Sequence, residues 1–207
     1  IMSYNVENLF DTIKDEDRND WEYLPRSQKN TREQKEFCMR QDPKYQDDCL
    51  HKDWNDKVVA EKMTRIADTI LQINGVGPDI LILAEVENIR VLKQLNDNYL
   101  QKAGYKTVEL IEGDDRRGID IGILSRLPLA GTPFLNRIKF THKPLPKTRG
   151  IMEVPLQLPN GETLYVLGVH FPSQANPREQ RVDAVNTLNE IYKFTVNHGY
   201  FVLSFRK

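Results

Sequence analysis

An unbroken run of apolar residues, Ile-Leu-Ile-Leu-Ala at positions 80–84, constrains the fold of this chain more than any other feature. A strand that is apolar on both faces is typical of the middle of a sheet covered on both sides. An amphipathic segment precedes the run, and a second one follows it at residues 89–102, up to Gly104. The run therefore predicts a central strand at residues 79–85 within a layered α/β domain.

The helices on either side of this strand have clear boundaries in the sequence. The preceding helix begins near Asn55 or Asp56, either of which can cap its first turn, and ends at Asn-Gly-Val-Gly-Pro. A last helix opens at Asn176-Pro177, and we expect it to end at Gly199.

The remaining apolar segments read as strands joined by short turns. Strands are predicted at the N-terminus, at residues 105–111, 119–125, 134–140, 151–158 and 163–170, and again from Tyr200. Asn160-Gly161 predicts a hairpin between two of them. Strands joined by hairpins and mixed with helices favour an α/β layered sandwich with a mixed sheet over a doubly wound parallel sheet.

The composition fits a folded domain of ordinary size. The chain has 207 residues, enough for one domain with its own core, and a formal net charge of −1. The net charge of such a chain does not attract a polyanion, so binding of nucleic acid would need a local cluster of basic residues. No apolar run approaches the roughly 18 residues that a transmembrane helix needs. We expect one domain over residues 1–207.

Residues 11–55 form a polar insertion in this pattern. The insertion shows little periodicity beyond one short helix expected at residues 31–39, and it is too long for an ordinary loop. It holds both cysteines of the chain, Cys38 and Cys49. They either close a surface loop as a disulfide or remain free thiols, and their number and spacing do not suit a zinc site. Paired cysteines in an exposed loop favour an exported protein, periplasmic or secreted, over a cytoplasmic one.

Polar residues lie in or at the end of three of the predicted strands. Asn5 lies in the first strand, Glu85 ends the central one, and His170 ends the strand at residues 163–170. Mg²⁺ prefers such oxygen ligands, usually one or two carboxylates completed by water and substrate phosphate. A histidine beside the ion can contact a phosphate oxygen or transfer a proton near neutral pH. Each residue alone is more often a structural group or a solvated strand end, so the hypothesis depends on all three meeting.

Four segments in this order, SYNVENLF, PDILILAEVEN, RRGIDIGILSR and LGVHFPSQ, resemble the endonuclease/exonuclease/phosphatase superfamily, and above all its bacterial members. The resemblance covers nearly the whole chain outside the insertion. It implies the deoxyribonuclease-like fold, a four-layer αββα sandwich with mixed sheets, and a Mg²⁺-dependent phosphoric-ester hydrolase that could also use Mn²⁺. Carried over, Glu85 is the metal ligand, Asn5 is a catalytic residue that helps to hold the metal, and His170 contacts the scissile phosphate. Ala84 stands where the family commonly has glutamine.

Basic residues near these motifs are candidates for binding phosphate. Arg117 follows Arg116 in the Asp-Asp-Arg-Arg-Gly segment, and Arg149 directly precedes the strand at residues 151–158. Related sequences often carry an arginine similar to Arg149. Lys143 and Lys147 are further candidates, although ordinary loop charges explain each of these residues singly.

Two more carboxylates lie beside the motifs. Asp120 alternates with apolar residues in its strand, so it should point away from the apolar face, and we predict a catalytic role in orienting His170. Glu87 has the spacing to share the face of Glu85, but a cap of the next helix explains it better, and Asn88 could serve as that cap equally well.

The resemblance stops at the C-terminus. Family members continue beyond the strand matching Tyr-Phe-Val-Leu-Ser with Gly-Asp-x-Asn and later Ser-Asp-His, whereas here Phe205-Arg206-Lys207 follows. In-line phosphoryl transfer needs a metal, a positioned nucleophile and stabilisation of phosphate charge. We therefore expect a truncated chain that is inactive alone, with an incomplete second sheet whose exposed edge favours self-association or a partner chain.

The sequence leaves the substrate open. DNA, RNA, a phospholipid headgroup or a small phosphate ester would each suit a metal-dependent phosphodiesterase, because the loops that choose among them carry no recognisable motif. The alternative from another class is a non-catalytic domain that keeps the fold and binds a partner. The two hypotheses differ in one property, since a non-catalytic domain has no need of a Mg²⁺ site that depends on Glu85.

Overall fold

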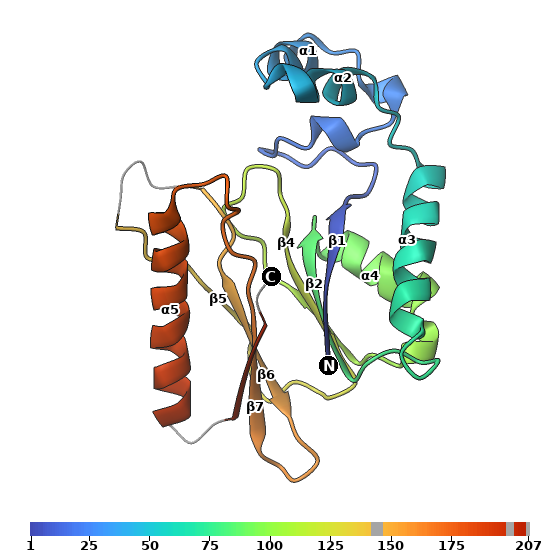
Figure 1. The fold of residues 1–207 in the computed structure, drawn as a ribbon. Helices are drawn as coiled ribbons and strands as arrows, with labels where there is room; N and C mark the ends of the chain where they lie inside the picture. Colours follow the sequence, from blue (N-terminus) through green and yellow to red (C-terminus); the bar gives the residue numbers. More distant parts are fainter. Residues whose placement is uncertain (142–146, 198–200, 206–207) are drawn as a thin grey trace.

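In the computed structural model, two four-stranded sheets pack face to face (Figure 1). The structure describes residues 1–141, 147–197 and 201–205. The first sheet has the strand order β1-β2-β4-β3 and the second the order β5-β6-β7-β8. The strands are β1 (Met2–Leu9), β2 (Ile80–Val86), β3 (Thr107–Leu110), β4 (Asp120–Ser125), β5 (Phe134–Asn136), β6 (Ile151–Gln157), β7 (Thr163–Gly168) and β8 (Phe201–Phe205).

Helices cover the outer faces of both sheets. The first sheet carries α3 (Asp56–Leu71) and α4 (Ile89–Tyr99), and the second carries α5 (Arg178–Asn197) (Figure 1). Isoleucines of β2 and β4 pack between the sheets against the apolar residues of β6 and β7. The four layers are therefore the αββα sandwich expected from the resemblance.

Strand β2 is central, as its apolar run predicts. It lies between β1, to which it is parallel, and β4, to which it is antiparallel. Leu81 and Leu83 pack in the core under α3 and α4, whereas Ile80 and Ile82 pack between the sheets. Each face of the strand has its own layer to contact, which explains why residues 80–84 are apolar on both faces.

Several predicted boundaries differ from the observed ones. The strand expected at residues 134–140 ends at Asn136, because the backbone beyond it bonds to α5 in place of β6. The Lys139 amide donates to Thr187 Oγ1 at 3.1 Å, and the Thr141 amide donates to Asp183 Oδ2 at 2.9 Å. The expected strand start at Tyr200, the helix end at Gly199 and the candidate Lys143 lie outside the described residues.

Helix α4 is capped by Asn88, one of the two residues proposed from the sequence. Its Oδ1 accepts a hydrogen bond from the Val91 amide at 3.0 Å. The helix ends at Tyr99, and a 3₁₀ turn at Gln101–Ala103 follows it up to Gly104. No helix among the described residues is both long and apolar enough to cross a membrane.

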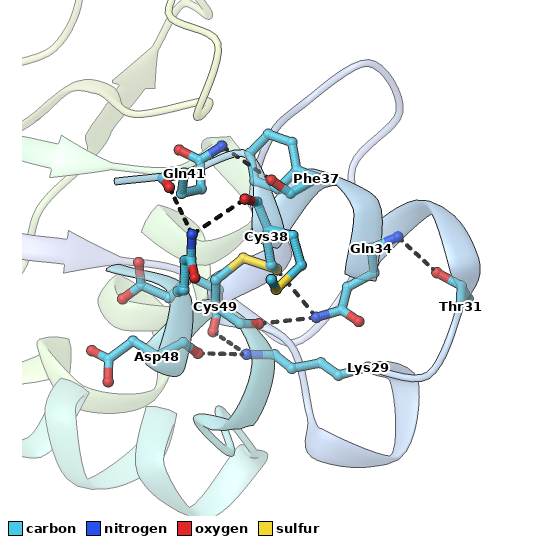
Figure 2. Close-up of a disulfide and its surroundings, with 11 residues drawn as sticks. Lys29, Thr31, Gln34, Phe37, Cys38, Gln41, Asp48 and Cys49 are labelled. Atoms are coloured by element: carbon cyan, nitrogen blue, oxygen red, sulfur yellow. Dashed lines mark hydrogen bonds between the residues drawn. A yellow bond between two sulfur atoms is a disulfide. The ribbon is translucent and has the colours of Figure 1, made fainter. Parts of the chain in front are cut away.

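The insertion contains more regular structure than its sequence predicts. It holds α1 (Arg32–Met39) and α2 (Pro43–His51), besides 3₁₀ turns at Trp21–Tyr23 and Arg26–Gln28. A disulfide between Cys38 and Cys49 joins the two helices, with a Cα–Cα distance of 5.5 Å (Figure 2). The buried Gln34 amide donates to the Cys49 carbonyl at 3.0 Å. These internal links stabilise two short helices that have little apolar surface to bury.

The insertion lies beyond the ends of β1 and β2, with α1 and α2 outermost (Figure 1). Aromatic contacts attach it to the sandwich: the rings of Phe10 and Tyr23 stack with centroids 4.0 Å apart, and Trp54 Nε1 donates to the Phe10 carbonyl at 3.2 Å. Arg90 of α4 adds a charged link to Asp11, at 2.6 Å. The insertion is therefore packed against one end of the sheets as a fixed structure.

Candidate functional site

Strand directions bring the predicted site residues to one end of the two sheets, which we call the rim. The end of β2 at Val86 pairs with the start of β4 at Asp120. In the second sheet, the end of β7 at Gly168 pairs with Met152 near the start of β6. The rim therefore collects residues that are far apart in sequence: Asn5, Glu85, Arg117, Asp120, Arg149 and His170.

Glu85 lies at the centre of the rim. Asn5 Nδ2 donates to Glu85 Oε1 at 2.7 Å, and His170 Nε2 lies 3.5 Å from the same oxygen. The side chains of Glu85 and His170 retain 17% and 11% of their exposure. The Asn5 oxygen accepts a hydrogen bond from the Glu7 amide at 2.7 Å, so its NH₂ group must be the end that faces Glu85. An amide, an acid and an imidazole thus meet from both sheets.

The backbone at the rim adopts a conformation that side chains disfavour. Glu85 has φ of 69°, and Glu7 and Asn8 at the end of β1 have φ of 53° and 65°. The pairing of β1 with β2 is irregular between Asn5 and Leu9, and that of β2 with β4 is irregular at Glu85. Left-handed residues other than glycine cost free energy and persist where the surrounding structure imposes them, often at functional sites. Here they turn Glu85 out of the regular pleat toward Asn5 and His170.

Gly168 allows the two sheets to approach closely just before His170. A Cβ atom at this position would lie 2.6 Å from Ile121 Cγ2 and 3.2 Å from Ile123 Cδ1, both on β4. Side chains of any other residue would push β7 away from the first sheet. The close approach therefore helps to place His170, two residues later, beside Glu85.

The two candidate phosphate-binding arginines lie in different environments. Arg149 is buried, and its Nη1 donates to Asp115 Oδ2 at 2.6 Å. Burial lowers the pKa of the Arg149 guanidinium, and the charge of Asp115 opposes that change. Arg117 keeps half of its side chain exposed, with its Nε 3.7 Å from Asp115 Oδ1. Asp115 thus holds both arginines, and of the two Arg117 is the one open to a ligand.

Asp120 is buried at the start of β4 rather than turned to solvent. It is 1% exposed, and neither carboxylate oxygen has a side-chain hydrogen-bond partner among the residues that the structure describes. Burial raises the pKa of Asp120 to about 7, although the nearby Gly113 amide and the charge of Arg18 oppose the rise. Its predicted role in orienting His170 stays a prediction, because no described contact supports it.

Glu87 does not join Glu85 at the rim. It is buried, and its Oε2 accepts a hydrogen bond from the Asp11 amide at 2.8 Å, which links β2 to the insertion. Burial, followed by the charges of Asp11, Asp15 and Asp20, raises the pKa of Glu87 to about 9. Across the described part of the chain, no three His, Cys, Asp or Glu residues form a metal-binding group. Of the two rim carboxylates, Glu85 keeps part of its side chain exposed, whereas Asp120 is buried.

Sequence reasoning missed three residues whose charges or contacts act at the rim. Asp115 holds the arginines, and its only signal in the sequence is its place in the Asp-Asp-Arg-Arg run. Lys62 of α3 donates to the Glu7 carbonyl at 3.0 Å, and burial lowers its pKa while Glu7 and Glu85 raise it. Tyr23 of the insertion also lies within range of the charge of Glu85. Neither Lys62 nor Tyr23 belongs to a motif, and only the fold places them here.

The sequence and the fold both have counterparts among known proteins. The sequence model of the Endonuclease/Exonuclease/phosphatase family matches residues 35–193. A crystal structure of TDP2 from Caenorhabditis elegans superposes with a TM-score of 0.52 at 15% identity, over 72% of this chain and 42% of that one. The human Nocturnin catalytic domain with bound sulfate gives 0.53 at 15% identity, over 70% of this chain and 56% of that domain. No curated protein matches by sequence.

These structural matches share the fold with this chain, which spans roughly half of their length.

Proposed function

The chain belongs to the endonuclease/exonuclease/phosphatase family, and from this premise we propose that it is a divalent-metal-dependent phosphodiesterase. The observation that carries the proposal is the meeting of three side chains at one oxygen. Asn5 Nδ2 lies 2.7 Å and His170 Nε2 lies 3.5 Å from Glu85 Oε1, and the three residues come from both sheets. Hydrolysis of a phosphate ester uses this combination of a metal-binding acid and a neighbouring proton donor.

The residues present fit a magnesium ion, with manganese as a substitute. Mg²⁺ is usually held by one or two carboxylates, with water and substrate phosphate in the remaining positions, so a single partly exposed Glu85 suits it. Asn5 would act as a positioning residue, because its amide holds Glu85 while its oxygen is engaged by Glu7. When bound, the ion would polarise a phosphoryl oxygen and neutralise developing charge.

The other rim residues supply separate functions. His170 is placed to donate a hydrogen bond to a phosphate oxygen or to transfer a proton. Arg117, exposed on its loop, supplies positive charge for the phosphate. Arg149 is buried and donates to Asp115. We propose that it contributes to phosphate binding mainly by holding the loop that carries Asp115 and Arg117. The disulfide supports an oxidising location, so we also propose an exported protein.

Isothermal titration calorimetry with Mg²⁺ and Mn²⁺ tests the metal site without requiring turnover. We expect one ion per chain, and Glu85→Gln should weaken its binding by at least about 100-fold. Glu153→Gln is the matched control, because Glu153 also accepts a hydrogen bond from an asparagine, Asn136, at 2.9 Å. Unchanged binding in Glu85→Gln, or none in the unaltered chain, would contradict the proposal and favour a non-catalytic partner-binding domain.

Hydrolysis of bis-para-nitrophenyl phosphate in Mg²⁺ or Mn²⁺ tests the chemistry. In a version of the chain that continues through the two C-terminal family segments, we expect activity that chelation removes, and His170→Ala should lower kcat by about 100-fold or more, because the imidazole acts in proton transfer or phosphate binding. Retention of activity after chelation, or in His170→Ala, would contradict the roles assigned to the rim.

A further inference from the structure

A cleft of about 780 Å³ lies between the insertion and the loop that carries Arg116 and Arg117. The α1 and α2 side is lined by residues that include Phe37 and Tyr45, and the 3₁₀ turn at Trp21–Tyr23 adds Tyr23. This volume is in the usual range for ligand-binding sites. Most of its lining side chains are polar, charged or aromatic, so the cleft differs from a packing void in an apolar core.

The cleft adjoins the rim through Arg117, a rim residue that also lines the cleft. Asn8, which lines it, lies three residues after Asn5 on β1. Arg117 lines the cleft and also contacts Asp115, the partner of Arg149. Burial raises the pKa of Tyr23, on which the charges of both Arg117 and Glu85 also act. A substrate with its phosphate at Glu85 would therefore extend into this cleft.

The exposed charges that line the cleft are mainly positive. Arg116 and Arg117 are both exposed, and the Arg116 carbonyl accepts a hydrogen bond from the Asn19 amide at 2.7 Å, which fixes the loop to the insertion. Of the two acidic residues in the lining, Glu22 is paired with Lys52 at 2.7 Å. The carboxylate of Asp48 opposes the two arginines. A ligand that brings its own negative charge near the loop complements this arrangement.

The aromatic residues of the cleft are presented unequally. Tyr23 has one face covered by Phe10, so it offers chiefly its edge and hydroxyl. Tyr45 is 54% exposed on α2, and Phe37 of α1 is half-buried beside it in the lining. Exposed rings next to arginines are typical of surfaces on which nucleic-acid bases stack while the backbone phosphates are bound.

The disulfide keeps these rings in place. Cys49 lines the cleft, and its bond to Cys38 joins the helix that carries Phe37 to the helix that carries Tyr45 (Figure 2). Gln41, between the helices, donates to the Phe37 carbonyl at 3.4 Å. Helices that are already held in place before binding lose little conformational entropy when a ligand binds.

We propose that the cleft binds the nucleotide next to the scissile phosphate in a single-stranded oligonucleotide. The base stacks on Tyr45 and Phe37, and the adjoining phosphate is bound by Arg116 and Arg117. This inference rests on the proposed phosphodiesterase function and assigns its substrate class. A lipid substrate would instead call for a contiguous apolar rim, whereas most side chains around this cleft are polar or charged.

Fluorescence anisotropy of a labelled single-stranded oligonucleotide, titrated with the chain in chelator to prevent cleavage, tests the proposal. Tyr45→Ala should raise Kd about 5-fold to 100-fold, whereas Tyr45→Phe, which keeps the ring, should stay within about twofold. The double variant Arg116→Ala/Arg117→Ala should raise Kd and reduce the slope of log Kd against log salt by about 1.4, for two lost phosphate contacts.

Matched controls and a second ligand decide the outcome. Arg32→Ala, on a 92% exposed side chain of the same insertion, and Tyr192→Ala, on the 45% exposed tyrosine of α5, should bind like the unaltered chain. Absence of oligonucleotide binding, or equal binding by the cleft variants and the controls, would overturn the proposal. So would binding to phosphatidylglycerol vesicles in place of the oligonucleotide.

The proposed function is tested separately by hydrolysis of the small diester. If the small diester is hydrolysed but the oligonucleotide does not bind, the phosphodiesterase function stands and the cleft assignment falls. Cleft-dependent binding without metal-dependent hydrolysis would support nucleotide binding and overturn the phosphodiesterase function.

Discussion

In each of the two sheets, an asparagine on one strand donates a hydrogen bond to a glutamate on the neighbouring strand. Asn5 donates to Glu85 at 2.7 Å between β1 and β2, and Asn136 donates to Glu153 at 2.9 Å between β5 and β6. Both glutamates are half-buried on strands. Glu153 lies in regular antiparallel pairing opposite Phe134, whereas Glu85 has φ of 69° and interrupts the pairing of β2 with β4.

A hydrogen bond from an asparagine to a glutamate is therefore not enough by itself to make a functional site. Glu85 differs in its backbone, in the nearby His170, and in the charges of Lys62 and Arg149 that act around it. Glu153 has a regular strand position with its asparagine partner. A pair with only a structural role would not require a glutamate with a left-handed backbone, or groups from both sheets around it.

The largest expected difference between the two pairs concerns metal affinity. Asn5→Ala removes the donor that orients Glu85, and we expect Mg²⁺ or Mn²⁺ affinity to fall about 10-fold to 100-fold. Asn136→Ala should leave affinity unchanged, because Glu153 has no ligand to hold. Calorimetry on both variants measures this, and equal effects would remove the distinction between the pairs.

The rim could be predicted because strand alternation and strand ends are local features of the sequence. The apolar run before Glu85 indicates a central strand, and a family resemblance adds Asn5 and His170 as neighbours. The left-handed backbone of Glu85 could not be predicted, since glutamate carries no signal for φ above zero. The pairing of Arg149 with Asp115 was also hidden, because it depends on how two loops approach one another.

The insertion could be predicted far less well. Helix α2 has few apolar residues, and it is held by the Cys38–Cys49 bond and by internal hydrogen bonds that periodicity does not reveal. Its position over the ends of β1 and β2 depends on Phe10 stacking against Tyr23. Local patterns therefore located the rim, whereas the cleft beside it required the tertiary structure.

Gly168→Ala tests whether the close approach of the sheets places His170 at Glu85. The added Cβ would meet Ile121 at 2.6 Å, so we expect a loss of about 1–3 kcal/mol in the free energy of unfolding and reduced hydrolysis. Gly131→Ala is the control, because its Cβ would meet Pro155 at an ordinary 3.4 Å. Denaturant unfolding measures stability. Full stability and activity in Gly168→Ala would contradict this reading of the rim.

Asp120→Asn tests the buried acid of the rim through its dependence on pH. Burial raises the pKa of Asp120 from 3.8 to about 7, so the stability supplied by the protonated carboxyl is present at low pH and lost as pH rises through about 7. Relative to Asp120→Asn, the unaltered chain should lose about 1.4 kcal/mol between pH 6 and pH 8. Parallel curves from denaturant unfolding would contradict a raised pKa, and Asp114→Asn, half-exposed in the adjoining loop, is the control.

Glycine and alanine at the two glutamates isolate the backbone difference, the smallest effect expected. Both substitutions remove the side-chain contacts, so their difference in unfolding free energy reports backbone conformation alone. At position 85, where φ is 69°, glycine should be more stable than alanine by about 1 kcal/mol. At position 153, in the regular strand β6, glycine should instead be less stable by about 0.5–1 kcal/mol. Opposite signs in the two chemical denaturation series would establish that strain distinguishes the rim, whereas equal signs would mean that the two pairs share one backbone environment.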